Sequence, residues 1–187
     1  INNLIEEHEK NLKSLRGKVS LVAGGPPCQG FSMAGRRKED DDRNKLIDSY
    51  IKFIELVQPN ILFFENVRGF TIGFKNGNKR GEAYSVYVVN KLKQLGYDVK
   101  GRIVDFSEYG IPQKRQRYIL VGIKKEYKIK AENFFDLLTQ NKADFFKSKN
   151  LEKDTTSLSD AISDLLQSNG TEQSPDTKNF RAGIYTK

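Results

Sequence analysis

A cysteine, a carboxylate and a pair of arginines are the residues of this chain whose types and placement could do chemistry together. The one cysteine, Cys28, follows the turn Gly24–Pro27, in which two prolines fix the backbone angles and two glycines leave space for a close approach. Glu65 directly follows a second apolar run, and Arg115 and Arg117 lie in a basic turn. A thiolate nucleophile, a carboxylic acid and guanidinium groups suit addition to an electron-poor ring in a polyanionic substrate.

Each of these features also has a simpler explanation. Cys28 could be an inert buried residue, Glu65 a helix cap or the ion-pair partner of an arginine, and residues 113–117 only a charged turn. The one histidine, His8, lies in a charged amphipathic stretch, which argues against a Cys/His dyad. A single cysteine cannot form an internal disulfide framework, and one cysteine with one histidine argues against a Cys/His metal site.

The elements that position these residues follow from the apolar pattern. Residues 19–23 predict a buried strand that ends at the Gly/Pro turn, and residues 61–64 predict a second buried strand that ends at Glu65. Between them, residues 44–57 predict a helix that Pro59 terminates. This order predicts a right-handed parallel crossover, which brings Cys28 and Glu65 to the same edge of a sheet.

The remaining elements extend this α/β pattern. Residues 97–106 and 118–123 predict an antiparallel hairpin whose turn, with its arginines, lies at the same edge. Residues 68–81 are rich in Gly, Asn and Lys and predict a mobile loop. Further helices are expected over residues 3–16, 82–95, 131–139 and 158–166. The first places Leu4, Ile5, Leu12 and Leu15 on one face. The second points Val86, Val89, Leu92 and Leu95 inward and is capped by Gly96.

Composition indicates a soluble, cytosolic protein with a nucleic-acid partner. The 187 residues suffice for one main domain, and no run approaches the roughly 20 apolar residues of a membrane span. The net charge of +8 favours a polyanion, although many basic proteins are merely kept soluble by their charge. Residues 30–43 predict a long exposed loop whose Arg36 and Arg37 could meet a phosphate backbone; the alternative is a solvated linker.

Three motifs now show a family resemblance. The segments PPCQGFS, ENV and QKRQR, in this order, resemble those of the DNA cytosine methyltransferases that make 5-methylcytosine, over residues 19–123. The resemblance implies part of a Rossmann-like S-adenosylmethionine-dependent methyltransferase fold, a mostly parallel sheet with an antiparallel edge hairpin. It also implies S-adenosylmethionine as cofactor, no metal, double-stranded DNA with a flipped cytosine as substrate, a cytoplasmic bacterial or phage setting, and a possible cognate restriction endonuclease.

The resemblance assigns roles to individual residues. Cys28 matches the nucleophile that adds to cytosine carbon 6, and Glu65 the residue that contacts ring nitrogen 3 and the exocyclic amine. Arg117 matches the arginine near the cytosine carbonyl oxygen, with Arg115 and Gln113 as its supporting partners. The matches to the catalytic loop and other substrate-contacting or DNA-contacting positions are Pro26, Gln29, Ser32, Arg36, Arg37 and Asn66, and those near the methyl donor are Gly25, Pro27 and Leu46.

The departures from the family pattern are equally specific. Nothing before Val19 resembles the Gly-rich strand-turn-helix that begins the family's cofactor site, and the target-recognition region is incomplete. We therefore expect residues 1–125 to be the catalytic part of a methyltransferase domain and 126–187 to be a linker and the start of a target-recognition region. The isolated piece is expected to be inactive. Alternatives are a tRNA cytosine-5 methyltransferase, which a comparison of the two acceptors would distinguish, and a non-catalytic DNA-binding subunit.

Overall fold

The computed structural model describes residues 1–27, 45–73, 75–76, 79–151, 156–162, 171–173 and 181–183. They form two compact units, which are described separately. The first comprises Ile1–Val104 and Gln116–Gln140, and the second comprises Asp105–Arg115 and Asn141–Lys187.

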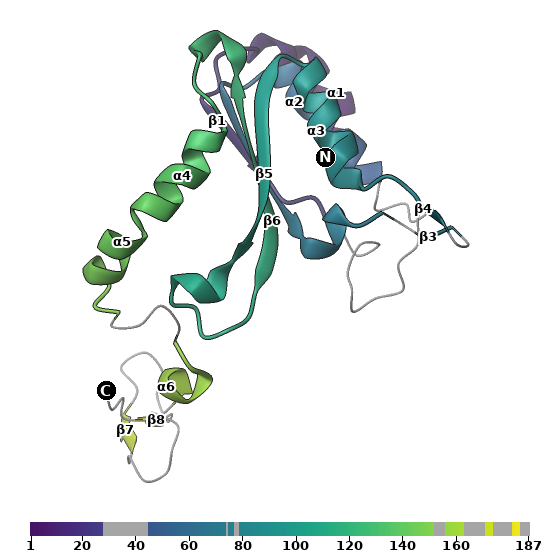
Figure 1. The fold of residues 1–187 in the computed structure, drawn as a ribbon. Coiled ribbons are helices and arrows are strands. Elements are labelled where there is room, and N and C mark those ends of the chain that lie inside the picture. The colour runs from purple at the N-terminus through teal and green to yellow at the C-terminus, as the bar shows by residue number, and fades with distance from the viewer. Residues whose placement is uncertain are drawn as a thin grey trace. The chain divides into compact units, whose positions relative to one another are not determined.

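The first unit alternates helices and strands (Figure 1). Its elements are α1 (Asn2–Ser14), β1 (Leu21–Gly24), α2 (Lys45–Val57), β2 (Ile61–Val67), the 3₁₀ helix η3 (Arg68–Thr71), β3 (Lys75–Asn76), β4 (Lys79–Arg80), α3 (Tyr84–Gln94), β5 (Tyr97–Asp105), β6 (Gln116–Lys124), η5 (Lys125–Tyr127) and α4 (Glu132–Gln140). The final residue of β5 already belongs to the second unit.

A four-stranded sheet with the order β1-β2-β6-β5 organises this unit. Strands β1 and β2 are parallel, with Gly24 opposite Phe64, and β6 runs antiparallel to β2, with Val67 opposite Arg117. The predicted α/β class is confirmed, and the described sheet, expected to be mostly parallel with an antiparallel edge hairpin, is a mixed sheet with a parallel start and antiparallel strands. This pairing brings the end of β1, the end of β2 and the beginning of β6 to one edge of the sheet.

One face of the sheet carries the main core. Because side chains alternate along a strand, Leu62, Phe64 and Leu120 point to the same face, and all three are fully buried. Helices α2 and α3 cover them with Ile47, Ile54, Val88 and Leu92, each also fully buried. Burial of each such side chain contributes about 1.5–3 kcal/mol, so this layer fixes the strands that carry the site.

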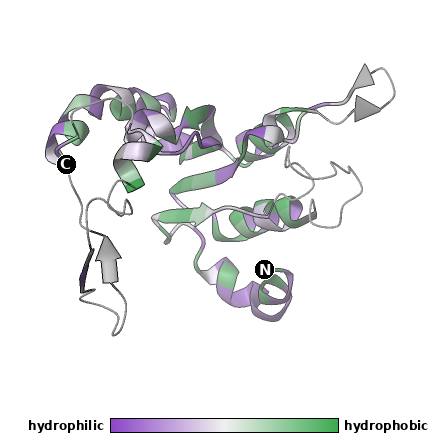
Figure 2. Ribbon diagram, turned by 90° about the horizontal axis from the view of Figure 1, so that it is seen from below, coloured by the Kyte–Doolittle hydropathy of each residue, from purple (hydrophilic) through white to green (hydrophobic). Residues whose placement is uncertain are grey.

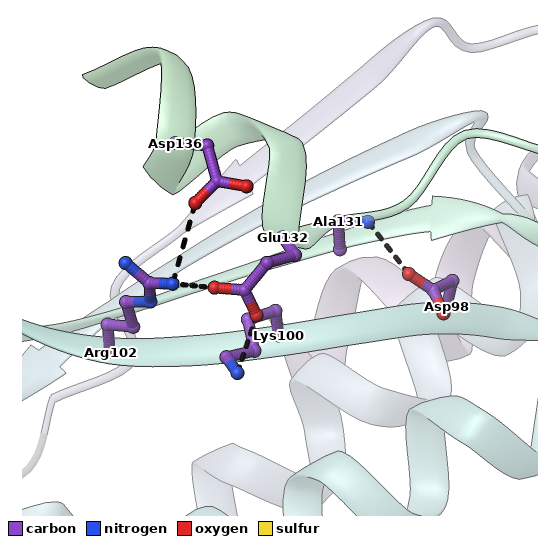
Figure 3. Close-up of polar contacts among 6 residues, drawn as sticks. All are labelled: Asp98, Lys100, Arg102, Ala131, Glu132 and Asp136. Atoms are coloured by element: carbon purple, nitrogen blue, oxygen red, sulfur yellow. Dashed lines mark hydrogen bonds and ion pairs between the residues drawn. The ribbon is translucent and has the colours of Figure 1, made fainter. Parts of the chain in front are cut away.

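Helix α4 packs on the opposite face. Phe134 makes an edge-to-face contact with Phe63, whose ring centroid lies 6.1 Å away. The helix start is fixed to β5 because the Asp98 carboxylate accepts a hydrogen bond from the Ala131 backbone N–H at 2.7 Å (Figure 3). Figure 3 also shows Glu132 between two cations of β5, Lys100 and Arg102.

Helix α1 packs against α2 with one narrow apolar stripe. Ile5 and Leu12 are buried there, together with Leu56 and Val57 of α2. Figure 2 shows α1, next to the N label, in mixed purple and green, as expected for a helix with a single apolar stripe. The sequence prediction was wrong for Leu4 and Leu15, which are 45% and 42% exposed, because the stripe of α1 that meets α2 is too narrow to include them.

Three further expectations are corrected by the structure. Strand β1 is not buried: it contacts only β2 within the described sheet, and Leu21 is 54% exposed. Val86 of α3 faces outward, since Val88 and Leu92 occupy the core side. The segment after β2, predicted to be a mobile loop, begins with η3, whose Phe70 is fully buried in the core.

The expected end of α3 is confirmed. Gly96 has a φ of +92°, the left-handed conformation that glycine adopts without steric cost, and its N–H bonds to the Lys93 carbonyl at 3.1 Å. The chain then turns directly into β5, where Tyr97 is fully buried and donates a hydrogen bond to the Pro59 carbonyl at 2.6 Å.

The second unit contains the connection between β5 and β6 and the C-terminal part of the chain. Its elements are the 3₁₀ helix η4 (Phe106–Tyr109), α5 (Lys142–Ser148), α6 (Leu158–Ile162), β7 (Thr171–Gln173) and β8 (Arg181–Gly183). Within it, the Lys142 ammonium group lies 5.6 Å from the Tyr109 ring centroid, and Leu151 lies against Gly110, which has a φ of +81°. The loop after η4 is thus packed against the α5 segment.

Candidate active site

The turn that precedes Cys28 is tied directly to β2. The buried Asn66 side chain, 1% exposed, donates a hydrogen bond from Nδ2 to the Pro26 carbonyl oxygen at 3.4 Å. Its Oδ1 accepts a hydrogen bond from the Val67 backbone N–H at 2.9 Å, which fixes the amide orientation. The sequence predicted a substrate contact for Asn66, and in the structure this side chain also tethers the Gly/Pro turn.

Glu65 lies immediately beside the same turn. A Cβ placed on Gly25 would lie 3.3 Å from Glu65 Oε2 and 3.5 Å from the Glu65 backbone oxygen. Gly25 therefore allows the carboxylate to approach the turn backbone, a use of glycine that depends on its missing side chain. The motifs that contain Cys28 and Glu65 meet here, since only Pro26 and Pro27 separate Gly25 from Cys28 in the sequence.

Arg117 forms the third part of the site. Its Nε lies 2.9 Å from Glu65 Oε1, and its Nη1 donates to the Gln116 carbonyl oxygen at 2.9 Å. Two guanidinium nitrogens are thus engaged at once, a planar geometry that lysine cannot reproduce. The simpler explanation of Glu65 was an ion pair with an arginine, and the structure shows this ion pair, with Arg117 as the partner.

Two details of this arrangement differ from the prediction. Glu65 was expected to be buried at a strand end, but its side chain is 40% exposed and lies within β2, which continues to Val67. Arg117 was expected in a turn, but it lies in β6, opposite Val67. The physical reason is the same for both: cross-strand pairing extends β2 and β6 past their apolar segments into the charged residues.

A pocket adjoins the turn on the side of β1 and α2. Its volume is about 510 Å³, within the range of sites for small organic ligands. It is lined by all three predicted cofactor residues, Gly25, Pro27 and Leu46, and further by Ile1, Leu4, Val22, Ala23, Gly24, Pro26, Tyr50 and Phe53. The sequence missed the contribution of Tyr50, whose ring packs so closely on Gly24 that a Cβ there would lie 2.6 Å from Tyr50 Cε2.

The remaining predicted residues lie elsewhere. Gln113 and Arg115 are exposed and belong to the second unit, where the Arg115 carbonyl accepts a hydrogen bond from the Phe106 N–H at 3.0 Å. The predicted nucleophile Cys28 and the predicted DNA contacts Gln29, Ser32, Arg36 and Arg37 lie outside the described residues. Among the described residues, no three metal-ligating side chains gather at one point.

The geometry thus brings Pro26, Glu65 and Arg117, one residue from each of the three motifs, to one edge of an α/β sheet, beside a pocket. A family model for the C-5 cytosine-specific DNA methylases matches residues 2–186. The chain belongs to this family. In the methylase, Gly24 at the end of β1 lies opposite Phe64 of β2, and Val67 at the end of β2 lies opposite Arg117 of β6.

Individual relatives agree with this assignment. The methylase is 34% identical over 155 residues to the type II methyltransferase M.DdeI of Desulfomicrobium norvegicum, covering 83% of this chain and 34% of that protein. It is 38% identical over 109 residues to the type II methyltransferase M.XorII of Xanthomonas oryzae pv. oryzae, covering 57% of this chain and 24% of that protein. The chain therefore spans between about a quarter and a third of the length of these relatives.

Among the solved structures, this chain is similar to that of the Entamoeba histolytica methyltransferase EhMeth. It is 24% identical, covers 62% of this chain and 34% of that chain, and has a TM-score of 0.46. In the part of the methylase that the structure describes, none of the helices combines the length and apolar character needed to cross a membrane.

Proposed function

We propose that this chain provides the catalytic face of a DNA (cytosine-5-)-methyltransferase of the type II restriction-modification class. The protein would be of bacterial or phage origin and act in the cytoplasm. The observation that carries the proposal is the hydrogen bond from Asn66 to the Pro26 carbonyl, because it holds the Cys28-bearing turn against the strand that supplies Glu65. The family membership and the type II relatives support the reaction class.

The chemistry begins with Cys28 as the nucleophile. Its thiolate sulfur forms a bond to carbon 6 of a flipped cytosine, and the electron pair of the ring double bond moves to carbon 5, which takes up a methyl group. Loss of the carbon 5 proton to water and cleavage of the sulfur–carbon bond then restore the aromatic ring and the thiolate. The stiff Gly/Pro turn limits the motion of the nucleophile, which favours reaction by orientation.

Glu65 and Arg117 act on the polar edge of the same ring. Arg117 holds Glu65 Oε1, while Oε2 lies on the side of the Gly25 turn, where ring nitrogen 3 and the exocyclic amine of a cytosine bonded to Cys28 would be recognised. The guanidinium group of Arg117 is placed to stabilise charge at the cytosine carbonyl oxygen. Gln113 and Arg115 are proposed to support it.

The methyl donor is proposed to be S-adenosylmethionine, which supplies the methyl group when bound. Gly25, Pro27 and Leu46 line the pocket beside the Gly/Pro turn, and the pocket wall of glycine backbone and apolar side chains suits a flat, largely apolar ligand group. The volume of about 510 Å³ is sufficient for a ligand of this size. We propose Arg36, Arg37, Gln29 and Ser32 as contacts to the DNA.

Covalent trapping on DNA tests the proposal. The full-length protein should form an irreversible adduct with a duplex that contains 5-fluorocytosine, because fluorine cannot leave as a proton does, and Cys28→Ala should form none. Methylation by Cys28→Ala, or the absence of an adduct with wild-type protein, would contradict the proposal. Offering tRNA and DNA as acceptors in parallel decides the substrate class, and preferential methylation of tRNA would overturn the assignment to DNA.

A further inference from the structure

Beyond the last backbone pair between β2 and β6, a side-chain hydrogen bond connects the ends of the two strands. The register ends at Val67 opposite Arg117, so the next residues outward are Arg68 and Gln116. Strand β2 stops at Val67 and η3 begins at Arg68, yet Arg68 Nη1 donates a hydrogen bond to Gln116 Oε1 at 2.8 Å. The side chains thus continue the ladder where the backbones separate.

Gln116 lies directly between this contact and the proposed site. Its backbone carbonyl accepts the hydrogen bond from Arg117 Nη1, and the Nε of the same guanidinium group pairs with Glu65 Oε1. The position of the Gln116 peptide therefore sets the orientation of the Arg117 guanidinium plane. A displacement of the start of β6 would move Arg117 relative to Glu65.

The backbone of Arg68 is well fixed for such a role. Two residues later, Phe70 is fully buried, and its ring centroid lies 5.3 Å from that of Phe64 and 5.8 Å from that of Tyr118. The Thr71 hydroxyl also donates to the Arg68 carbonyl at 2.9 Å. Consequently η3 is anchored on β2 and β6 themselves, and the exposed Arg68 side chain extends from a rigid base.

We propose that Arg68 is a positioning residue for methyl transfer. By holding Gln116 it fixes the start of β6, and with it the geometry of the Arg117–Glu65 pair. The inference rests on the proposed function, because that pair is assigned to the cytosine ring. A solvent-exposed hydrogen bond contributes little to global stability, so its effect is expected on the site more than on the fold.

The test measures single-turnover methylation of a DNA duplex by the full-length protein. Arg68→Ala and Gln116→Ala should each lower the rate on the order of tenfold, since small misplacements of catalytic groups are costly, with KM for DNA changed less than about twofold. The double variant should be no slower than either single variant, because both changes break one contact. Gln116→Glu, which retains an acceptor for Arg68, should keep most of the wild-type rate.

A matched control separates this role from general destabilisation. Arg102→Ala also removes an exposed arginine that pairs across elements, but at the α4 contact of Figure 3, and it should leave the rate of methyl transfer unchanged. If Arg68→Ala does not fold, Gln116→Ala and Gln116→Glu still decide the question. Wild-type rates in both of these variants would overturn the proposal.

The competing role for Arg68 is a direct contact to a DNA phosphate. In that case Arg68→Ala would raise KM and reduce the salt dependence of DNA binding by about one unit of slope, while Gln116→Ala would leave the rate unchanged, and our proposal would be wrong. Failure of the proposed function is recognised separately, because wild-type protein would then neither methylate DNA nor form the 5-fluorocytosine adduct.

Discussion

The Asn66 side-chain amide and the Pro26 carbonyl, 40 residues apart in the sequence, are joined by a hydrogen bond of 3.4 Å. The bond connects the turn before Cys28 to the strand that carries Glu65. Since Asn66 is buried, the Pro26 carbonyl has a partner that water does not replace. This contact makes the two motifs one structural unit.

Replacing the donor of this hydrogen bond is the most direct test of its importance. Asn66→Asp keeps an acceptor for the Val67 N–H but places a carboxylate oxygen against the Pro26 carbonyl. We expect the free energy of unfolding to fall by about 1–3 kcal/mol, the cost of an unsatisfied buried polar group, and methylation to slow. Urea denaturation measures the first effect. Asn90→Asp, at an exposed position of α3, is the control, and an equal loss in both variants would contradict the tether.

Arg117→Lys tests whether the planar guanidinium group is needed. Lysine keeps the charge but cannot pair with Glu65 and bond to the Gln116 carbonyl in the same fork geometry. We expect kcat to fall by about 10²-fold, a typical cost of removing one preorganised donor, with little change in melting temperature. Arg102→Lys at the α4 contact should leave kcat unchanged. Wild-type kcat in Arg117→Lys would exclude the proposed role.

Gly24 and Gly25 are adjacent, but substituting each by alanine should affect stability and methylation in opposite ways. A Cβ on Gly24 would lie 2.6 Å from the Tyr50 ring, so Gly24→Ala should destabilise the fold by about 1–3 kcal/mol through overpacking. A Cβ on Gly25 would meet the end of the Glu65 side chain, at 3.3 Å from Oε2, and this group can move aside. Gly25→Ala should therefore keep its melting temperature but lose methylation. Equal melting temperatures in the two variants would show that Tyr50 does not pack on the turn as described.

The buried Tyr118 predicts a loss of stability at high pH. Burial raises the pKa of Tyr118 from its ordinary value of 10.0 to about 12, because the phenolate is poorly solvated there. The stabilising contribution is complete below pH 10 and is lost as the pH rises towards 12, because the unfolded chain ionises first. We expect wild-type protein to lose on the order of 1–3 kcal/mol more than Tyr118→Phe between pH 9 and 11.5, measured by urea denaturation at each pH.

The control for the pH experiment is a tyrosine at the surface. Tyr127 is 44% exposed, and Tyr127→Phe should follow the wild-type pH dependence of the free energy of unfolding. Parallel curves for wild-type protein and Tyr118→Phe would mean that Tyr118 is not the group responsible.

The sequence by itself determined the order of the elements and the meeting of the motifs. Apolar periodicity located α2, β2 and β6, the positive φ of Gly96 follows from its place after α3, and the strand-helix-strand order predicted the parallel pairing of β1 and β2. These features depend on residues close together in the sequence, which is why local patterns suffice. The family membership follows from the motifs for the same reason.

Only the tertiary structure decided how the site residues are held. That Asn66 bonds to Pro26, that Gly25 gives space to Glu65, and that Arg117 pairs with Glu65 all depend on cross-strand register. Register is set by contacts between distant segments, and a shift of one residue between β2 and β6 would place Glu65 and Arg117 on opposite faces of the sheet. For this reason, the sequence alone could not predict the exposure of Glu65 or the position of Arg117 within β6. The chemistry of the two residue types could be predicted from the sequence.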